Sequence, residues 1–426
     1  MHRIRPLSLT QGHPMLQAMR SAHFSPPLVK LSVATLSVLA AAATTACSAG
    51  HKSQNQSGQS QGSMMPTPAD TSGLNNAAFS SDVVKCTNFS SGYPGDNECI
   101  VAPDAAAGFQ FHYGPASYTD TNEVAKYVLM PGDETTDCLF FPTPNADDVY
   151  FNEYHSRMRP GSHHMLLYVQ PANGAPRTSS APEPCNQGLQ TRNLFGATSP
   201  EMDVKDIDPA PENVGLAVKI PPTQQAVMQM HVINATDKPI LKESWANIVY
   251  TDPSTVKELA DPIFFIAGVS MSIQVGQTVI NKGTATVPQN AASNFRLVAA
   301  IPHIHAHTPK FTAYKTIGGQ KELLLQQFGV LDVPTDPHIV FFDSVLKNPP
   351  ADEASHTDGA YSGTVYLKPG DTIDWECEQT NDGVGANGKT FTTPLRFTEQ
   401  AYTGEMCNMF GLYAPSTGSA WQGLGL

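Results

Sequence analysis

The chain has 426 residues, and 25 Lys and Arg against 38 Asp and Glu give it a formal net charge of −13. Such an acidic surface repels nucleic acid and anionic lipid headgroups, so we expect no nucleic-acid partner. Charged residues make up only 15% of the chain, while Gly and Pro number 32 and 35. This composition favours short strands joined by turns over long charged helices or coiled coils.

The N-terminal segment has the features of an export signal. A run of apolar and small side chains over residues 31–46 follows several basic residues and ends at Cys47. It is shorter than the roughly 20 residues of a membrane-spanning helix and is typical of a signal peptide core. The sequence ATTAC at 43–47 resembles a bacterial lipobox. We therefore predict a lipoprotein signal peptide over residues 1–46, with an ordinary cleaved signal peptide as the alternative.

Lipidation of Cys47 would anchor the exported protein to the bacterial cell envelope, at the outer membrane or the periplasmic face. The residues that follow, up to 82, are mostly Ser, Gln, Gly, Asn and Ala, with few large apolar side chains. Their burial cannot offset the entropy lost on ordering. We expect residues 47–82 to be a disordered tether, with the folded body beginning near residue 83.

The body of the chain is rich in strand patterns. Apolar or β-branched stretches bounded by turn residues occur at 163–169, 214–220, 226–233, 311–315, 339–342 and 364–367. Sustained helical periodicity is nearly absent, and a break near residues 251–261 separates two halves. We predict an all-β fold with two antiparallel, jelly-roll-like β-sandwich domains, at residues 83–250 and 255–415.

Six cysteines remain once the lipidation site is set aside: Cys86, Cys99, Cys138, Cys185, Cys377 and Cys407. An even number in an exported chain favours three disulfides over free thiols. The short interval between Cys86 and Cys99 makes that pair plausible. The residues alone leave the other two pairings open.

Histidines stand in three apolar, strand-like settings: the adjacent His163 and His164, then His231, and finally His303 with His305. Imidazole is the commonest metal ligand among side chains, and a merely solvated histidine would be unusual in these settings. Half-buried structural histidines are the alternative for any one of them. Together, the five indicate an exported β protein that binds metal.

The spacing of these histidines has structural consequences. Because side chains alternate along a strand, His303 and His305 share one face and form a chelating pair. His307 continues the spacing and is a candidate third ligand, although the proline at 309 suggests that the strand ends there. The adjacent His163 and His164 can share one metal only where the strand is bulged or bent.

Four motifs occur in the order found in the copper type II, ascorbate-dependent monooxygenases: HHM at 163–165, QMH at 229–231, HIH at 303–305 and GEMCN at 404–408. The chain therefore resembles this family over roughly residues 120–415. The family includes the peptidylglycine α-hydroxylating and dopamine β-monooxygenases.

The resemblance implies two copper ions per chain. The ligands of the first, an electron donor, would be His163, His164 and His231. The ligands of the second, which binds dioxygen and attacks the C–H bond, would be His303, His305 and Met406. A soft thioether favours Cu(I), the state that meets dioxygen. Ascorbate or another one-electron donor would be the reductant, and the second ligand set would be catalytic.

The resemblance also implies two disulfides, Cys138 with Cys185 and Cys377 with Cys407. The second would clamp the strand that carries the ligand methionine and remove a competing thiolate. A blue-copper electron carrier normally has a histidine shortly after its cysteine ligand, and no histidine occurs beyond His356. Zinc suits three imidazoles but cannot do redox chemistry.

The chain departs from the peptide-amidating member at its substrate-binding positions. Where that enzyme grips a carboxylate with an arginine and a tyrosine, this chain has Ile301 and Phe410, and only Asn408 matches. We therefore expect a copper-dependent monooxygenase that hydroxylates a C–H bond of a small neutral or apolar substrate. The alternatives are a non-catalytic surface copper-binding lipoprotein and a β-sandwich adhesion or glycan-binding module.

Overall fold

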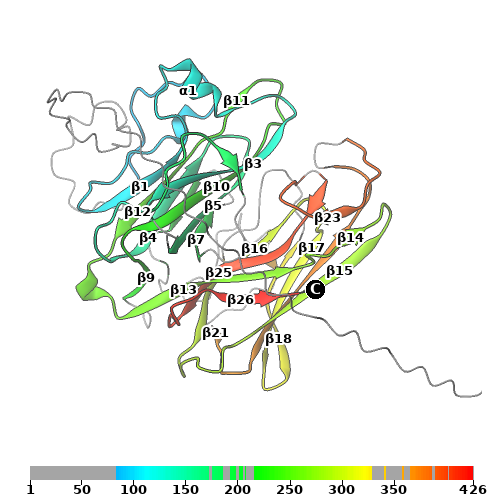
Figure 1. The fold of residues 1–426 in the computed structure, drawn as a ribbon. Helices are drawn as coiled ribbons and strands as arrows, with labels where there is room; N and C mark the ends of the chain where they lie inside the picture. The colour runs from blue at the N-terminus through cyan, green and yellow to red at the C-terminus, as the bar shows by residue number, and fades with distance from the viewer. Residues whose placement is uncertain are drawn as a thin grey trace, which may run out of the picture. The chain divides into compact units, whose positions relative to one another are not determined.

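The computed structural model describes residues 83–171, 175–185, 192–197, 201–204, 207, 215–328, 340–341, 357–358, 365–385, 389–401 and 403–425 (Figure 1). The chain divides into two units, Met1–Gly62 and Ser63–Leu426, and every described residue belongs to the second. The predicted signal peptide, the lipidation site at Cys47 and the tether lie outside the described residues.

Strands dominate the described chain, which confirms the predicted all-β fold. The helical segments in this part of the chain are short: η1 (Asp96–Glu98), α1 (Thr121–Ala125) and η3 (Pro253–Thr255). None of the helices described here has the length and apolarity needed to cross a membrane.

The first half of the chain contributes most of its strands to two large sheets. One is five-stranded, in the order β6-β3-β10-β5-β7. Its strands are β3 (Glu134–Pro142), β5 (Ser162–Pro171), β6 (Glu183–Pro184), β7 (Arg192–Ala197) and β10 (Gln224–Ile233). The other has the order β1-β12-β4-β9, with β8 beside β4. Its strands are β1 (Gly108–Tyr113), β4 (Val149–Met158), β8 (Glu201–Val204), β9 (Leu216–Ile220) and β12 (Ser244–Tyr250).

Both faces of the five-stranded sheet are covered. On one face, alternate residues of β5 and β10, including Met165 and Met228, enter the core of the first half. The intervening residues, including Leu166 and Val227, belong to a different apolar cluster that also contains Phe264 and other side chains of the second half. Coverage on both sides explains why these two strands are almost continuously buried instead of alternating between buried and exposed positions.

The second half continues the larger sheet in the order β13-β26-β15-β22-β17-β18-β20, while β25 pairs with both β13 and β16. Its long strands are β13 (Glu258–Ala267), β15 (Thr278–Thr286), β16 (Arg296–Ile304), β17 (Lys310–Ile317), β18 (Gln320–Phe328), β22 (Thr372–Thr380) and β25 (Cys407–Ala414). The short ones are β14 (Ser272–Ile273), β19 (Val340–Phe341), β20 (Thr357–Asp358), β21 (Val365–Tyr366), β23 (Leu395–Phe397), β24 (Gly404–Glu405) and β26 (Trp421–Leu424). A further two-stranded pair, β2 (Val128–Leu129) with β11 (Ile240–Leu241), lies in the first half.

The two halves share hydrogen-bonded structure. The start of β13 pairs in parallel with β9, from Glu258 opposite Leu216 to Ala260 opposite Val218, so one 16-stranded sheet includes strands of both halves. The expected domain boundary falls in the segment between β12 and β13.

The six cysteines form three disulfides, Cys86–Cys99, Cys138–Cys185 and Cys377–Cys407. The first lies in the N-terminal segment, which is attached to the first half by the buried Arg159. Its guanidinium donates to Glu243 at 2.5 Å and to Asp96 at 2.8 Å. The third joins β22 to the first residue of β25.

Candidate metal centre

The first-half histidines lie on neighbouring strands of the five-stranded sheet. His231 on β10 stands opposite His164 on β5, and the next residue, Val232, stands opposite Ser162. His163 is therefore the extra residue of a β-bulge. A bulge at this point was the predicted condition for adjacent histidines to face one site. The ring centroids of His163 and His164 lie 5.3 Å apart.

The second-half histidines lie at the end of β16. Ala300 and Ile304 point into the core of the second half, so alternation places His303 and the following His305 on the opposite face. Ala299, on that same opposite face, packs into the core of the first half. The predicted shared face of the H-x-H pair is thus present, and it is the face that meets the first half.

The five histidines converge in one cluster. The His163 ring centroid lies 4.9 Å from that of His231 and 5.5 Å from that of His305. The His164 and His303 centroids lie 4.7 Å apart. Ligand nitrogens of His163, His231 and His305 all lie within 4.8 Å of one another. The rings of the two expected ligand sets therefore interleave, and the assignment of each ring to one of two copper ions stays a prediction.

Burial controls the charge of this cluster. Each of the five side chains is at most 3% exposed. Burial, followed by the neighbouring His231 imidazole, lowers the pKa of His303 to about 3. The same causes hold the pKa values of His163, His164 and His305 well below the usual 6.5. Neutral rings at pH 7 offer lone pairs, which is the form that binds metal.

Several of these ring nitrogens have no hydrogen-bond partner. Neither nitrogen of His164 has one, and neither do the Nδ1 atoms of His231 and His303. Buried polar atoms without partners are rare in folded proteins, and an absent ion is one explanation for them. A metal would use these lone pairs, so the residues present fit a bound ion.

Glu134 on β3 orients the ring of His231. Its Oε1 lies 2.7 Å from Nε2 of His231, whose side chain is fully buried. A carboxylate at this position accepts from an Nε2–H group, an arrangement that would leave Nδ1 for a metal. Sequence reasoning missed Glu134, since it stands 97 residues from its histidine partner and belongs to none of the motifs.

Glu405 fixes the backbone around the second-half donors. It is fully buried, and its carboxyl oxygens accept from the backbone N–H groups of His305 at 2.5 Å, His307 at 2.8 Å and Met406 at 2.9 Å. Burial raises the pKa of Glu405 to about 8, although these hydrogen bonds act against the rise. The carboxyl group ties the end of β16 to the start of β25.

Met406 immediately precedes β25 and is 3% exposed. Ile304 pairs with Cys407, so the register brings Met406 next to His305 along the two strands. The Asn408 side chain donates to the Met406 sulfur at 3.4 Å, and Gln379 donates to the Met406 carbonyl at 2.9 Å. Asn408 therefore contacts the thioether itself, while Gln379 holds the backbone of Met406.

His307 is not brought into the cluster. Its ring packs against Phe391 at a centroid distance of 5.7 Å, and its Nδ1 lies 3.9 Å from Asp382. Its backbone N–H contacts Glu405 instead. The bend that follows β16 takes His307 away from the face shared by His303 and His305.

Apolar side chains border the cluster. The Phe410 ring stacks on Phe264 at a centroid distance of 5.0 Å and contacts the His303 ring at 5.2 Å. Ile301 is 5% exposed and lies on the same strand as His303. The two positions that differ from the amidating enzyme are thus buried and apolar.

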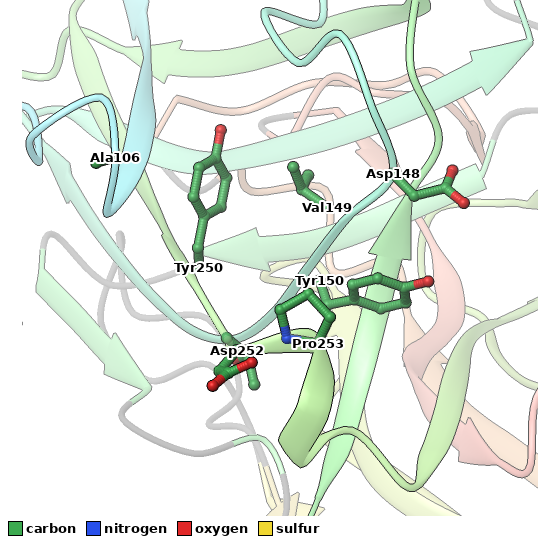
Figure 2. Close-up of a pocket in the computed structure, with 8 residues that line it drawn as sticks. Ala106, Asp148, Val149, Tyr150, Tyr250, Asp252 and Pro253 are labelled. Carbon is green, nitrogen blue, oxygen red and sulfur yellow. The ribbon is translucent and has the colours of Figure 1, made fainter.

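A separate cleft of about 320 Å³ lies in the first half, where Figure 2 shows Tyr150, Tyr250, Asp148 and Asp252 around it. Asp148 forms an ion pair with Lys219, and Asp252 caps the turn at Ser254. None of the residues lining this cleft belongs to the histidine cluster.

The donor set defines the chemistry that the centre offers. Neutral imidazoles suit Cu(I), Cu(II) and Zn(II), whereas a thioether is a soft ligand suited to Cu(I). The chain matches no family model, and no curated protein sequence matches it.

Proposed function

We propose that the protein is a copper-dependent monooxygenase that hydroxylates a C–H bond of a small substrate, using O2 and a one-electron reductant such as ascorbate. The observation that carries the proposal is the convergence of five buried histidines from both halves of the chain, next to the segment that bears Met406. The motif resemblance supports two copper ions per chain.

The proposed ligands are those implied by the resemblance. The electron-donating copper would be held by His163, His164 and His231. The copper at the catalytic position would be held by His303, His305 and Met406. Bound copper would supply the one-electron chemistry that zinc lacks.

The surrounding residues would prepare this site for metal. Burial excludes water and lowers the pKa values of His163, His164, His303 and His305, which favours their neutral forms. Glu134 contacts the His231 ring, and Asn408 donates to the Met406 thioether. Outer partners of this kind set ligand direction and metal affinity.

The proposed substrate is small and neutral or apolar. Phe410 and Ile301 occupy the positions at which the amidating enzyme binds a carboxylate, and both are buried beside His303. An anionic substrate would have no cation at these two positions, and burying an unpaired charge is costly.

We also propose that the protein is exported and lipid-anchored through Cys47 to the bacterial cell envelope. Its three disulfides are compatible with export. Metabolic labelling with a fatty-acid analogue tests the anchor, since Cys47→Ala should abolish the label.

The test of function is copper analysis of the purified chain, combined with reductant-dependent O2 uptake coupled to a hydroxylated product. About two coppers per chain and coupled uptake are expected, and Met406→Ala should abolish turnover. Copper binding without O2 uptake would favour the copper-binding lipoprotein. If His163→Ala and Met406→Ala leave function unchanged, the histidines are structural, as an adhesion or glycan-binding module predicts.

A further inference from the structure

We infer that Glu134 is a positioning residue that couples the two proposed copper sites, so that an ion bound by the first-half ligands strengthens binding by the second-half ligands. The inference rests on the two ligand sets of the proposed function and leaves their members unchanged. It adds a route by which one set acts on the other, and its test measures metal affinity and amide exchange instead of turnover.

One carboxylate oxygen of Glu134 joins a first-half ligand to the second-half backbone. Its Oε1 lies 2.7 Å from Nε2 of His231 and accepts the backbone N–H of Ala401 at 2.6 Å. Ala401 is 3% exposed and packs against Ile233, which stands opposite Glu134 where β10 pairs with β3. Little water competes for this bridge, and hydrogen bonds are stronger in such surroundings.

The segment after Ala401 leads directly to the second-half ligand Met406. Ala401 lies between β23 and β24, two short strands that pair in parallel. The chain folds back tightly here, because a Cβ added to Gly404 would clash with the side chain of Thr398. A turn with so little free space passes a fixed position at Ala401 on to Gly404 and the residues after it.

Glu405, the next residue, fixes the backbone of two second-half ligands. Its carboxyl oxygens accept from the backbone N–H groups of His305 at 2.5 Å and Met406 at 2.9 Å. The carbonyl of Met406 accepts in turn from Gln379 at 2.9 Å. The positions of these two ligands therefore depend on the turn that Glu134 holds.

The coupling has its physical cause in the two hydrogen bonds of Glu134. When Nδ1 of His231 binds an ion, its Nε2–H becomes a stronger donor and holds the carboxylate more firmly. The fixed carboxylate then orders the turn at Ala401 before the second-half ligands bind their own ion, so that this binding loses less conformational entropy. By linkage, the second ion strengthens binding of the first to the same degree.

The experiment uses Zn(II) to load the first-half set, because three imidazoles suit zinc whereas a thioether favours Cu(I). Chelator competition measures the Cu(I) affinity of the full chain with and without equimolar Zn(II), and X-ray absorption identifies the site that has the copper–sulfur bond of Met406. The ratio of the two affinities of this site is the coupling factor. Repulsion between the two ions lowers the factor equally in every variant, so the variants can be compared directly.

We expect the coupling factor of the wild type to exceed that of Glu134→Gln by about 5-fold or more, within the range typical of coupled sites. Ala401→Pro removes the N–H group but leaves the carboxylate, and it should lower the factor to a similar degree. Glu123→Gln on α1 is the matched control and should keep the wild-type factor. Circular dichroism and thermal unfolding of the metal-free variants check that each one folds.

Hydrogen exchange at the Ala401 amide gives a readout that a purely structural contact would not change. Zn(II) should slow this exchange in the wild type, because the bound ion strengthens the hold on Glu134, and the slowing should be lost in Glu134→Gln.

The coupling is overturned if Glu134→Gln or a folded Ala401→Pro keeps the wild-type coupling factor, or if Zn(II) leaves the exchange of the Ala401 amide unchanged in the wild type. Any of these results in a chain that binds two copper ions would leave the proposed function standing. A wild-type chain that binds neither metal would overturn the coupling and the proposed function together.

Discussion

Glu134 holds two neighbours with one oxygen, the ring of His231 and the backbone of Ala401. Its side chain is 10% exposed, so little water competes for these contacts. A carboxylate on the far nitrogen of a histidine fixes the tautomer and raises the basicity of the ligating nitrogen. We therefore expect Glu134 to influence any metal that binds through His231.

We expect Glu134→Gln to lower Cu(II) affinity by about 10- to 100-fold, because the uncharged amide oxygen is a weaker acceptor and raises the basicity of the His231 ring less than a carboxylate does. Chelator competition measures the change. The control is Glu123→Gln, the same substitution on α1, where Glu123 pairs only with Lys126 among the ion pairs described. Equal affinities for both variants would contradict the role of Glu134.

His155, which lies outside the histidine cluster, makes a pH-dependent contribution to the free energy of unfolding. Burial alone would lower its pKa, but hydrogen bonds and charges from Glu153 and Asp203, each 2.8 Å away, raise it above 6.5. The folded protein therefore binds this proton more tightly than the unfolded chain. The resulting stability is fully present below pH 6.5 and is lost as pH rises through the folded pKa.

We accordingly expect the wild type to exceed His155→Gln in free energy of unfolding by more at about pH 6 than at about pH 9. Urea titrations of both proteins at the two pH values measure the difference. An advantage that stays constant, or grows, toward alkaline pH would show that protonated His155 is not favoured by folding.

At the scale of elements, β16 and β25 determine where the second-half donors lie. Their register places Asn408 opposite His303 and Cys407 opposite Ile304. The disulfide Cys377–Cys407 fastens the start of β25 to β22. A slip of one residue would turn the donors toward the core of the second half.

Gly411 permits the close approach of these two strands. Its φ is +151°, and a Cβ there would lie 2.0 Å from the Ala299 carbonyl oxygen. We expect Gly411→Ala to lower the free energy of unfolding by about 3 kcal/mol or more, since strain and a backbone clash act together.

Gly132 is the matched control, because its φ is +81° and a Cβ there would meet nothing within 4 Å. Gly132→Ala should cost only about 1 to 2 kcal/mol, from backbone strain alone. Denaturant unfolding compares the two variants. If they lose the same amount, the contact between Gly411 and β16 is not what makes glycine necessary.

At the scale of the whole molecule, the histidine cluster depends on the packing of one half against the other. The halves share a sheet through β9 and β13 and an apolar cluster around Phe264 and Phe410. An ion bound in this cluster would bind the folded chain much better than the unfolded one. Metal binding should therefore stabilise the molecule as a unit.

We expect Cu(II) at about 100 times its Kd to raise the free energy of unfolding by about 2.7 kcal/mol over the chelator-treated protein, with both halves unfolding in one transition. Calorimetry with and without chelator measures this. A metal-dependent shift confined to one of two separate transitions would place the ion within a single half.

Much of the fold and part of the candidate site could be predicted from sequence patterns and composition. Because side chains alternate along a strand, His303 and His305 are expected to share a face regardless of the rest of the fold. Composition and the density of turn residues indicated an all-β body, and the even number of cysteines, together with the predicted export signal, indicated three disulfides. These conclusions depend on composition or on spacing within a few residues, so the sequence determined them by itself.

The tertiary structure alone decided which side chains meet. That His163 is the bulged residue follows from its pairing with β10, and the roles of Glu134 and Glu405 follow from hydrogen bonds to residues 97 and 100 positions away. His305 comes beside His163 because two apolar sheet faces pack together. Such contacts arise from packing distant strands, and no local spacing encodes them.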